Sequence, residues 1–549
     1  MKLLTPIFRI FDLNTLIIAV LYAILKPFFY NIFYFHFSPN LSQHRTNILR
    51  FLDNHYIPFD GFSIFGNALT NPMLLVPFLF FAGFAFLNRQ TKWESFDNPR
   101  MVKRLVMLLV GYITWWNVTL PFNHYFEQWY LLDRIILIFL MISLWFSPIV
   151  VLLVVPLNFL FFAQMTYPVG AMSTLHFFVL YDGIILFLCL IFAKKIVSLF
   201  PQIATKNGVN PSWTLQYLVL AYCLLTSSYL YSGIKKIVES PKGINWVFEN
   251  EQYIDFQFFM EQGWLYFLSP STKNQLLETA HALNSFILAA ILLAQIGVIF
   301  SFANKKYFRM VVGTLICFHV GFFLLDGCSF LEWIILDAFF IYVFTISKEF
   351  SSTAFNKNTF LSSMGLFLLG FIIFTPPKLA WYESRSRRIF SFEVENTEGV
   401  RFKISPNDLG FGNAVFAGLN INYLFNRKTL SNTDFGDKYK GMNLIKHASM
   451  GNLDSLTLAF GENPYNLIIM ENTKRYIVNY FKNSEKQYRW LSVLSPPGHY
   501  LSMRWQDNNI HPTLIQNPKS FIVKAQEKFI NSNDDSVLRD SFSISIPLK

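Results

Sequence analysis

Long apolar runs separated by short polar segments fill the chain between residues 14 and 376. A helix needs about 20 mostly apolar residues to cross the hydrocarbon core of a bilayer, and most of these runs approach that length. The expected spans cover 14–35, 72–88, 104–120, 132–146, 149–165, 174–192, 213–232, 280–303, 308–325, 330–347 and 359–376. The pattern therefore predicts an α-helical polytopic membrane bundle with about eleven spans.

One boundary between two spans depends on a proline. The stretch from Asp133 to Ala171 is too long for one span and long enough for two tilted ones. Pro148 disfavours the helical conformation in Ser147, so we expect a helical hairpin to turn at this point. A single long span with a re-entrant piece is the alternative.

The basic residues predict an orientation. Clusters of Lys and Arg occupy the connections at 89–104, 194–206, 305–309 and 348–357. With about eleven spans and a cytoplasmic N-terminus, all four clusters fall on the cytoplasmic side, as the positive-inside rule expects. The sequence thus predicts a multi-pass protein of a bacterial inner (cytoplasmic) membrane, with the segment after the last span on the extracytoplasmic side.

The character of the chain changes at Pro376-Pro377. Beyond these prolines, residues 389–394 and 400–404 alternate apolar and polar side chains, which is typical of half-buried strands, and a helix is expected around 476–491. We therefore expect three parts: additional transmembrane helices in 1–130, a main transmembrane domain in 131–376, and an extracytoplasmic β-containing (α+β) domain in 377–549.

Composition narrows the class of function. Hydrophobic residues make up 53% of the chain and charged residues 14%, whereas a soluble domain carries about 25% charged residues. This excludes a disordered chain and argues against an ordinary cytosolic enzyme. The net charge of +11 comes from basic residues beside apolar runs, so we expect no nucleic-acid partner. The cysteines and histidines lack metal-ligand spacing, and no metal is expected.

The segment 213–347 carries the candidate chemistry. It contains Tyr231-Ser-Gly-Ile-Lys235-Lys236, then Asn245-Trp246, Phe267-Leu-Ser-Pro270, His281-Ala-Leu-Asn284 and Phe318-His319. Ionisable groups at membrane depth are costly, so they usually face a cavity or a partner. Lysines that end a span also snorkel to the interface, and histidines within spans also join helices. The lysine pair is predicted to lie on the outer side, where the positive-inside preference gives no reason for it.

This ordered set resembles the vitamin K-dependent gamma-carboxylase family, whose bacterial relatives are the horizontally transferred transmembrane domain (HTTM) proteins. The resemblance is clearest over 213–347. It implies a lyase- or oxidoreductase-like enzyme with a reduced quinone of the vitamin K type as cofactor. By motif position, Lys236 would be the base that deprotonates the quinol, with Lys235 its neighbour and His319 polarising the quinol oxygen. The expected quinone-binding residues are Tyr229, Trp246, His281 and Asn284. The loop between Lys236 and Trp246 is longer than the family pattern.

Three functions are compatible with these features. The first is a membrane enzyme that uses an isoprenoid quinol or a similar lipid near Lys236. The second is a non-enzymatic membrane helper for maturation or export of a secreted peptide or protein, and the third is a transporter or assembly subunit. The expected partners are membrane lipid and a secreted peptide or protein substrate.

Overall fold

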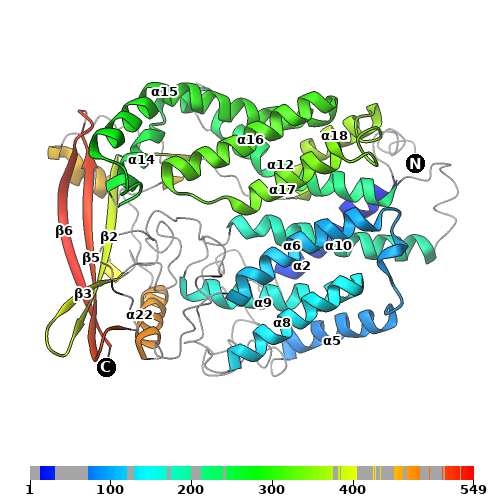
Figure 1. Ribbon diagram of the computed structural model, residues 1–549, viewed down its shortest axis with the longest axis horizontal. Coiled ribbons are helices and arrows are strands. Elements are labelled where there is room, and N and C mark those ends of the chain that lie inside the picture. The colour runs from blue at the N-terminus through cyan, green and yellow to red at the C-terminus, as the bar shows by residue number, and fades with distance from the viewer. Residues whose placement is uncertain are drawn as a thin grey trace.

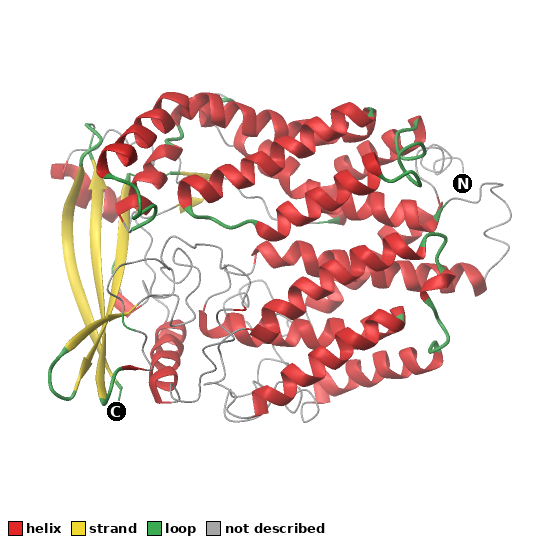
Figure 2. Ribbon diagram, viewed as in Figure 1, coloured by secondary structure: helices red, strands yellow, loops and turns green. Residues whose placement is uncertain are grey.

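The computed structural model describes most of the chain. The described residues are 13–30, 72–119, 129–169, 175–199, 212–238, 243–261, 263–374, 381–383, 385–404, 424–425, 427, 433–434, 450–460, 467–482, 494, 510, 514–531 and 533–548. They are mostly helical, and one antiparallel sheet lies at one end of the helical part (Figure 2).

The helices form two groups that lie side by side (Figure 1). The first group contains α2 (Leu13–Phe29), α5 (Pro72–Leu87), α6 (Pro99–Thr119), α8 (Trp129–Phe146), α9 (Val151–Val169) and α10 (Leu175–Leu199). The second contains α12 (Trp213–Val238), α13 (Asn245–Glu249), α14 (Gln252–Glu261), α15 (Pro270–Gly297), α16 (Lys305–Asp326), α17 (Leu331–Ile341) and α18 (Lys357–Ile373). Short helical turns lie at Trp93–Ser95, Pro148–Val150, Val298–Ala303 and Tyr342–Ile346.

Helix α12 joins the two groups. It packs against α2, α6 and α10 on one side and against α15 and α18 on the other. Its apolar residues from Leu215 to Leu230 are buried on every face, which explains why this run is nearly continuous rather than amphipathic. The candidate lysines at its end are therefore held by the most enclosed helix of the second group.

The predicted count of about eleven spans is wrong. Within the described residues, three helices are long and apolar enough to cross a membrane: Trp213–Val238, Pro270–Ala303 and Lys305–Asp326. Several of the other predicted spans form helices of 17 residues or fewer, such as α2 and α18. At 1.5 Å per residue these are shorter than the roughly 30 Å hydrocarbon core. Three spans give no support for an extracytoplasmic C-terminal domain, since that placement depended on the larger count.

Apolar composition predicts too many membrane spans, because a helix buried among other helices needs the same apolar side chains as a helix that faces lipid. In α10, for example, the residues from Leu180 to Leu190 are almost all fully buried against neighbouring helices. The predicted break between two helices at Ser147-Pro148 is confirmed: α8 ends at Phe146, Ser147 is extended with φ −140° and ψ 121°, and a helical turn that begins at Pro148 leads into α9.

The strands predicted after the helices are confirmed. Residues 389–394 lie in β2 (Ser386–Asn396) and residues 400–404 correspond to β3 (Arg401–Ile404). The four-stranded sheet adds β5 (Pro518–Ile530) and β6 (Ser536–Pro547), in the antiparallel order β3-β2-β5-β6. A two-residue pair joins β1 (Trp381–Tyr382) to β4 (Thr433–Asp434). The expected helix around 476–491 begins earlier, as α22 (Leu467–Lys482), and α21 (Leu453–Phe460) precedes it.

Charged pairs attach the sheet to the second group of helices. Arg385, which lies one residue before β2, donates two hydrogen bonds of 2.8 Å to the carboxylate of Glu251. Lys528 of β5 contacts Glu261 of α14 at 2.6 Å. Bidentate pairing of a guanidinium with a carboxylate constrains distance and orientation together. These contacts place the sheet beside α14 (Figure 1).

Candidate functional site

Lys236 is a buried lysine near the C-terminal end of α12. Its side chain is 6% exposed, and Nζ donates a hydrogen bond of 3.0 Å to Oε1 of Gln295 on α15. The same nitrogen lies 4.6 Å from the ring centre of Trp246, on α13. Lys235 is half-buried, because adjacent residues on a helix point about 100° apart. Of the two lysines, Lys236 is the one that the protein encloses.

Gly233 allows α15 to reach this lysine. A methyl group on Gly233 would lie 3.0 Å from Cδ1 of Ile296 and 3.1 Å from Cβ of Gln295, both closer than ordinary packing contacts. Gly233 is three residues before Lys236, so it lies on nearly the same face of the helix. The glycine of the Tyr-Ser-Gly-Ile-Lys-Lys sequence therefore lets the backbone of α15 approach until Gln295 can accept from Lys236.

Tyr231, at the start of that sequence, donates a hydrogen bond to the backbone of α18. Its hydroxyl donates to the backbone oxygen of Phe367 at 2.6 Å, and the donor is shared with the oxygen of Leu368 at 3.3 Å. Both acceptors belong to α18. Tyr231 thus joins α12 to α18, whereas Lys236 faces α15 and α13.

A second polar group lies two turns earlier on α12. The hydroxyl of Tyr229 is 2.7 Å from Nε2 of His319 on α16 and donates to Oδ2 of Asp337 on α17 at 3.0 Å. Tyr229, His319 and Asp337 are at most 5% exposed. Three helices therefore meet at one hydroxyl group, which links an imidazole to a carboxyl group.

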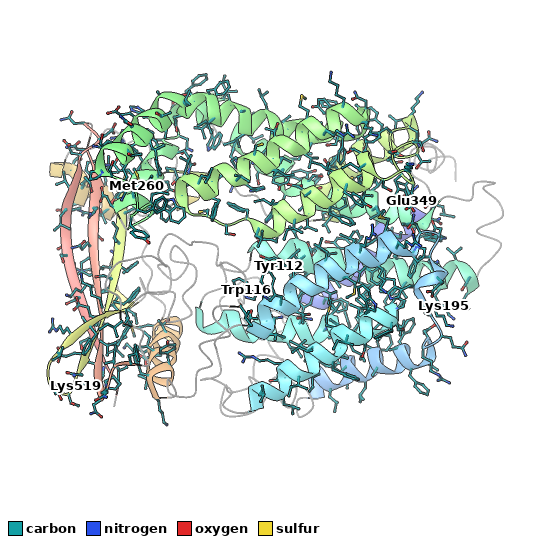
Figure 3. The ribbon with its side chains drawn as sticks, in the orientation of Figure 1. Tyr112, Trp116, Lys195, Met260, Glu349 and Lys519 are labelled. Atoms are coloured by element: carbon teal, nitrogen blue, oxygen red, sulfur yellow. The ribbon has the colours of Figure 1, made fainter. Side chains whose placement is uncertain are left out.

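Aromatic rings enclose this second group. Trp333 lies on the same face of α17 as Asp337, one turn earlier, and its ring centre is 5.0 Å from that of Tyr229. The ring of Phe330 is 4.7 Å from that of His319. On α17, Glu332 accepts a hydrogen bond of 3.2 Å from the hydroxyl of Tyr112 on α6. Tyr112 lies at the boundary between the two groups of helices (Figure 3).

The two polar groups share one side of α12. Tyr229 and Lys236 are seven residues apart, which corresponds to about two turns and nearly the same direction around the helix axis. Phe318, the neighbour of His319, and Phe322 pack against the apolar cluster that contains Trp246. Aromatic side chains therefore extend from the lysine to the histidine.

The remaining expected quinone-site residues lie toward the sheet. His281 is 58% exposed and stacks on Tyr253 with ring centres 4.2 Å apart, and Nδ1 is 4.0 Å from Oδ2 of Asp534 in the loop between β5 and β6. Asn284 is buried and donates to the backbone oxygen of Asn250 at 2.7 Å. His281 thus contacts the C-terminal part, whereas Asn284 contacts the connection between α13 and α14, and neither of these contacts involves Lys236 or His319.

Two residues of these groups were not anticipated from the sequence. Gln295 and Asp337 each interrupt an apolar run, and a polar or ionisable residue in such a run is itself a signal of a specific contact. The sequence did not indicate which lysine or histidine Gln295 and Asp337 would lie close to. Within the described residues, no group of three or more His, Cys, Asp or Glu side chains is arranged to hold a metal ion.

No protein-family model, curated protein or solved structure matches the chain.

Proposed function

We propose that this protein is a membrane enzyme in which Lys236 removes a proton from a hydroxyl group of a lipid-soluble hydroquinone. The observation that carries this proposal is the position of Lys236: a buried amine held between the amide oxygen of Gln295 and the face of Trp246. The resemblance of the surrounding sequence to the gamma-carboxylases led to the same residue.

The contacts of Lys236 suit a group that changes its charge. Burial disfavours the ammonium form, because water no longer solvates the charge. The oxygen of Gln295 and the face of the Trp246 ring both attract a cation, so they stabilise the ammonium form once a proton has been taken up. A general base must be able to exist both as the neutral amine and as the ammonium. Burial favours the first form and the two contacts favour the second, so both are accessible to Lys236.

The surroundings suit a flat apolar ligand. Trp246, Phe318 and Phe322 belong to or pack against one apolar cluster, and aromatic faces bind flat rings by offset or edge-to-face stacking. Lys236 is two residues from the end of α12, which is one of the helices long and apolar enough to cross a membrane. A lipid-soluble substrate would reach such a position from the bilayer, without first passing through water.

Ionisation of a bound quinol tests the proposal directly. The probe is vitamin K1 hydroquinone, kept reduced under nitrogen and added to the full chain in lipid nanodiscs. Binding is followed by quenching of tryptophan fluorescence, and proton removal by the shift of the naphthohydroquinone absorbance to longer wavelength. The wild-type protein should bind the quinol and ionise it. Lys236→Met should bind it without ionising it.

Lys235→Met is the matched control, because it removes a neighbouring lysine of the same helix that is half-buried rather than enclosed. It should ionise the quinol as the wild type does. A wild-type protein that does not bind the quinol, or a Lys236→Met variant that still ionises it, would overturn the proposal. Either result would favour a non-enzymatic helper for a secreted peptide or protein.

A further inference from the structure

The hydroxyl group of Tyr229 has hydrogen-bond geometry on both sides. It lies 2.7 Å from Nε2 of His319 and 3.0 Å from Oδ2 of Asp337. A phenol has one proton to donate and lone pairs that accept. When Asp337 is ionised, Tyr229 donates to it and must accept from His319, so the imidazole carries its proton on Nε2. The three side chains thus form an uninterrupted path for a proton between α16 and α17.

Unsatisfied polar atoms next to this path are an independent observation. Among the described residues, Oδ1 of Asp337 and Nε1 of Trp333 are buried and have no hydrogen-bond partner. Buried polar atoms without a partner are uncommon, and a catalytic role or a bound molecule is among the explanations for them. The indole N–H is a donor only, so it requires an acceptor. The ring of Trp333 lies 5.0 Å from that of Tyr229 and 6.1 Å from that of His319.

The charge at this position limits which ligand would fit. Asp337 and Glu332 place two buried carboxyl groups on one short helix. A negatively charged ligand would be repelled whenever either carboxyl group is ionised, because little solvent screens the charges here. An oxygen that accepts from Trp333 without carrying charge, such as a carbonyl or hydroxyl oxygen, satisfies both conditions.

We propose that Asp337, Tyr229 and His319 form a buried proton relay that serves as an acid–base site for an uncharged ligand bearing a hydroxyl or carbonyl oxygen. In the forward direction the ligand hydroxyl gives its proton to Nδ1 of His319. Nε2 passes its proton to the oxygen of Tyr229, and the phenol proton moves to Oδ2 of Asp337. One O–H bond breaks on the ligand and one forms on Asp337, so a single negative charge moves from the carboxylate to the ligand. No step uses Lys236.

Other ionisable side chains lie near the relay. Glu332 lies on the same helix as Asp337 and accepts from Tyr112 of α6. Glu332 and Tyr222 both lie within electrostatic range of Tyr229. Tyr222 belongs to the same helix as Tyr229 and is fully buried, and its hydroxyl donates to Oγ of Ser301 at 2.7 Å. Tyr222 therefore provides a control tyrosine that has a buried hydrogen bond but does not belong to the relay.

Infrared spectroscopy over a pH series tests the relay. The full chain is placed in lipid nanodiscs with isotope-labelled aspartate in one sample and isotope-labelled histidine in another. Asp337→Asn and His319→Gln identify the two bands. In the wild type, the carboxyl band of Asp337 and the ring band of His319 should each change in the same two steps, because the macroscopic pKa values of coupled groups belong to the pair. In Tyr229→Phe, each band should change in a single step with its own midpoint. Tyr222→Phe should leave them coupled.

A second arm tests the ligand class with menadione, an uncharged ring with two carbonyl oxygens. Menadione should shift the His319 band in the wild type and equally in Lys236→Met. Trp333→Phe, which keeps a ring but removes the N–H donor, should abolish the shift. Independent titration in the wild type, retained coupling in Tyr229→Phe, or no response of the wild type to menadione would overturn the inference. Lys236→Met retains the relay residues. A failure of the relay inference would therefore appear in the infrared bands, whereas a failure of the proposed function would appear in quinol ionisation.

Discussion

Lys26 and Asp182 form an ion pair between α2 and α10, with 2.8 Å between Nζ and Oδ2. Both side chains are mostly buried, and the other oxygen of Asp182 accepts from Tyr30 at 2.9 Å. Lys26 interrupts the first apolar run of the sequence. In the structure its ion pair with Asp182 joins α2 to α10.

Lys26→Met should destabilise the protein strongly, because it leaves the carboxylate of Asp182 buried without its cation. Loss of one partner of a buried pair costs about 3–5 kcal/mol in the free energy of unfolding. Lys26→Met combined with Asp182→Asn should recover much of this loss, since no charge then remains. Denaturant unfolding in mixed micelles measures both. As a control, Arg427→Ala breaks the exposed pair with Asp540 and should cost about 1 kcal/mol or less. Equal effects at the two pairs would contradict this explanation.

Gly233→Ala should disturb the contact between α12 and α15. The added methyl group would lie 3.0–3.1 Å from side-chain atoms of Ile296 and Gln295, so these neighbours must shift by a few tenths of an ångström. Overpacking of this kind costs about 1–3 kcal/mol, and the shift should weaken the hydrogen bond of Lys236 to Gln295. Gly313→Ala on α16 is the matched control, because nothing lies within 4 Å of its added methyl group. That substitution should be neutral or stabilise by about 0.4–1 kcal/mol. Thermal unfolding of both variants measures these effects. A Gly233→Ala variant as stable as the wild type would show that the close approach of α15 to α12 does not require glycine.

Tyr231→Phe should affect stability but not chemistry. It removes the hydrogen bond to the backbone oxygen of Phe367 and should cost about 1 kcal/mol. Quinol binding and ionisation should remain those of the wild type, since Tyr231 faces α18 and Lys236 faces α15. Tyr266→Phe, at an exposed tyrosine, controls for loss of a hydroxyl group in general. Loss of quinol ionisation with unchanged stability would assign Tyr231 to the site instead.

Arg385→Lys should loosen the sheet from the helices. Lysine cannot reproduce the two parallel hydrogen bonds to Glu251, nor the further contact with Asp534 at 3.3 Å. Amide hydrogen exchange should accelerate in β5 and β6 while α12 stays protected. The same substitution at Arg401, whose pair with Glu395 is largely exposed, should leave exchange unchanged. If α12 exchanges faster as well, the sheet and the helices unfold as one unit.

Local pattern was sufficient for several elements of this protein. Alternation predicted the strands at 389–394 and 400–404, because side-chain direction in a strand alternates with a period of two. Pro148 predicted the end of α8, because its ring restricts the residue before it. The Tyr-Ser-Gly-Ile-Lys-Lys sequence directed attention to Lys236, and the structure places that lysine in an enclosed position.

The number of membrane-crossing helices was not predictable in this way. An apolar helix surrounded by other helices and one surrounded by lipid have the same composition, since both exclude water. Only the packing shows that the apolar residues of α10 contact protein. The lengths of α2 and α18 were likewise not predictable from composition, and only the structure shows where each helix ends.

The sequence by itself determined the strands at 389–394 and 400–404, the end of α8 before Pro148 and which lysine pair deserved interest, because these depend on neighbours a few residues apart. The tertiary structure alone decided the partners. Lys236 meets Gln295 at a separation of 59 residues, and Tyr229 meets Asp337 at a separation of 108. His281, three residues from Asn284 on one helix, meets Asp534 of the C-terminal part. Contacts over such separations follow from how helices pack, and helix packing depends on the shapes of whole faces rather than on any local pattern.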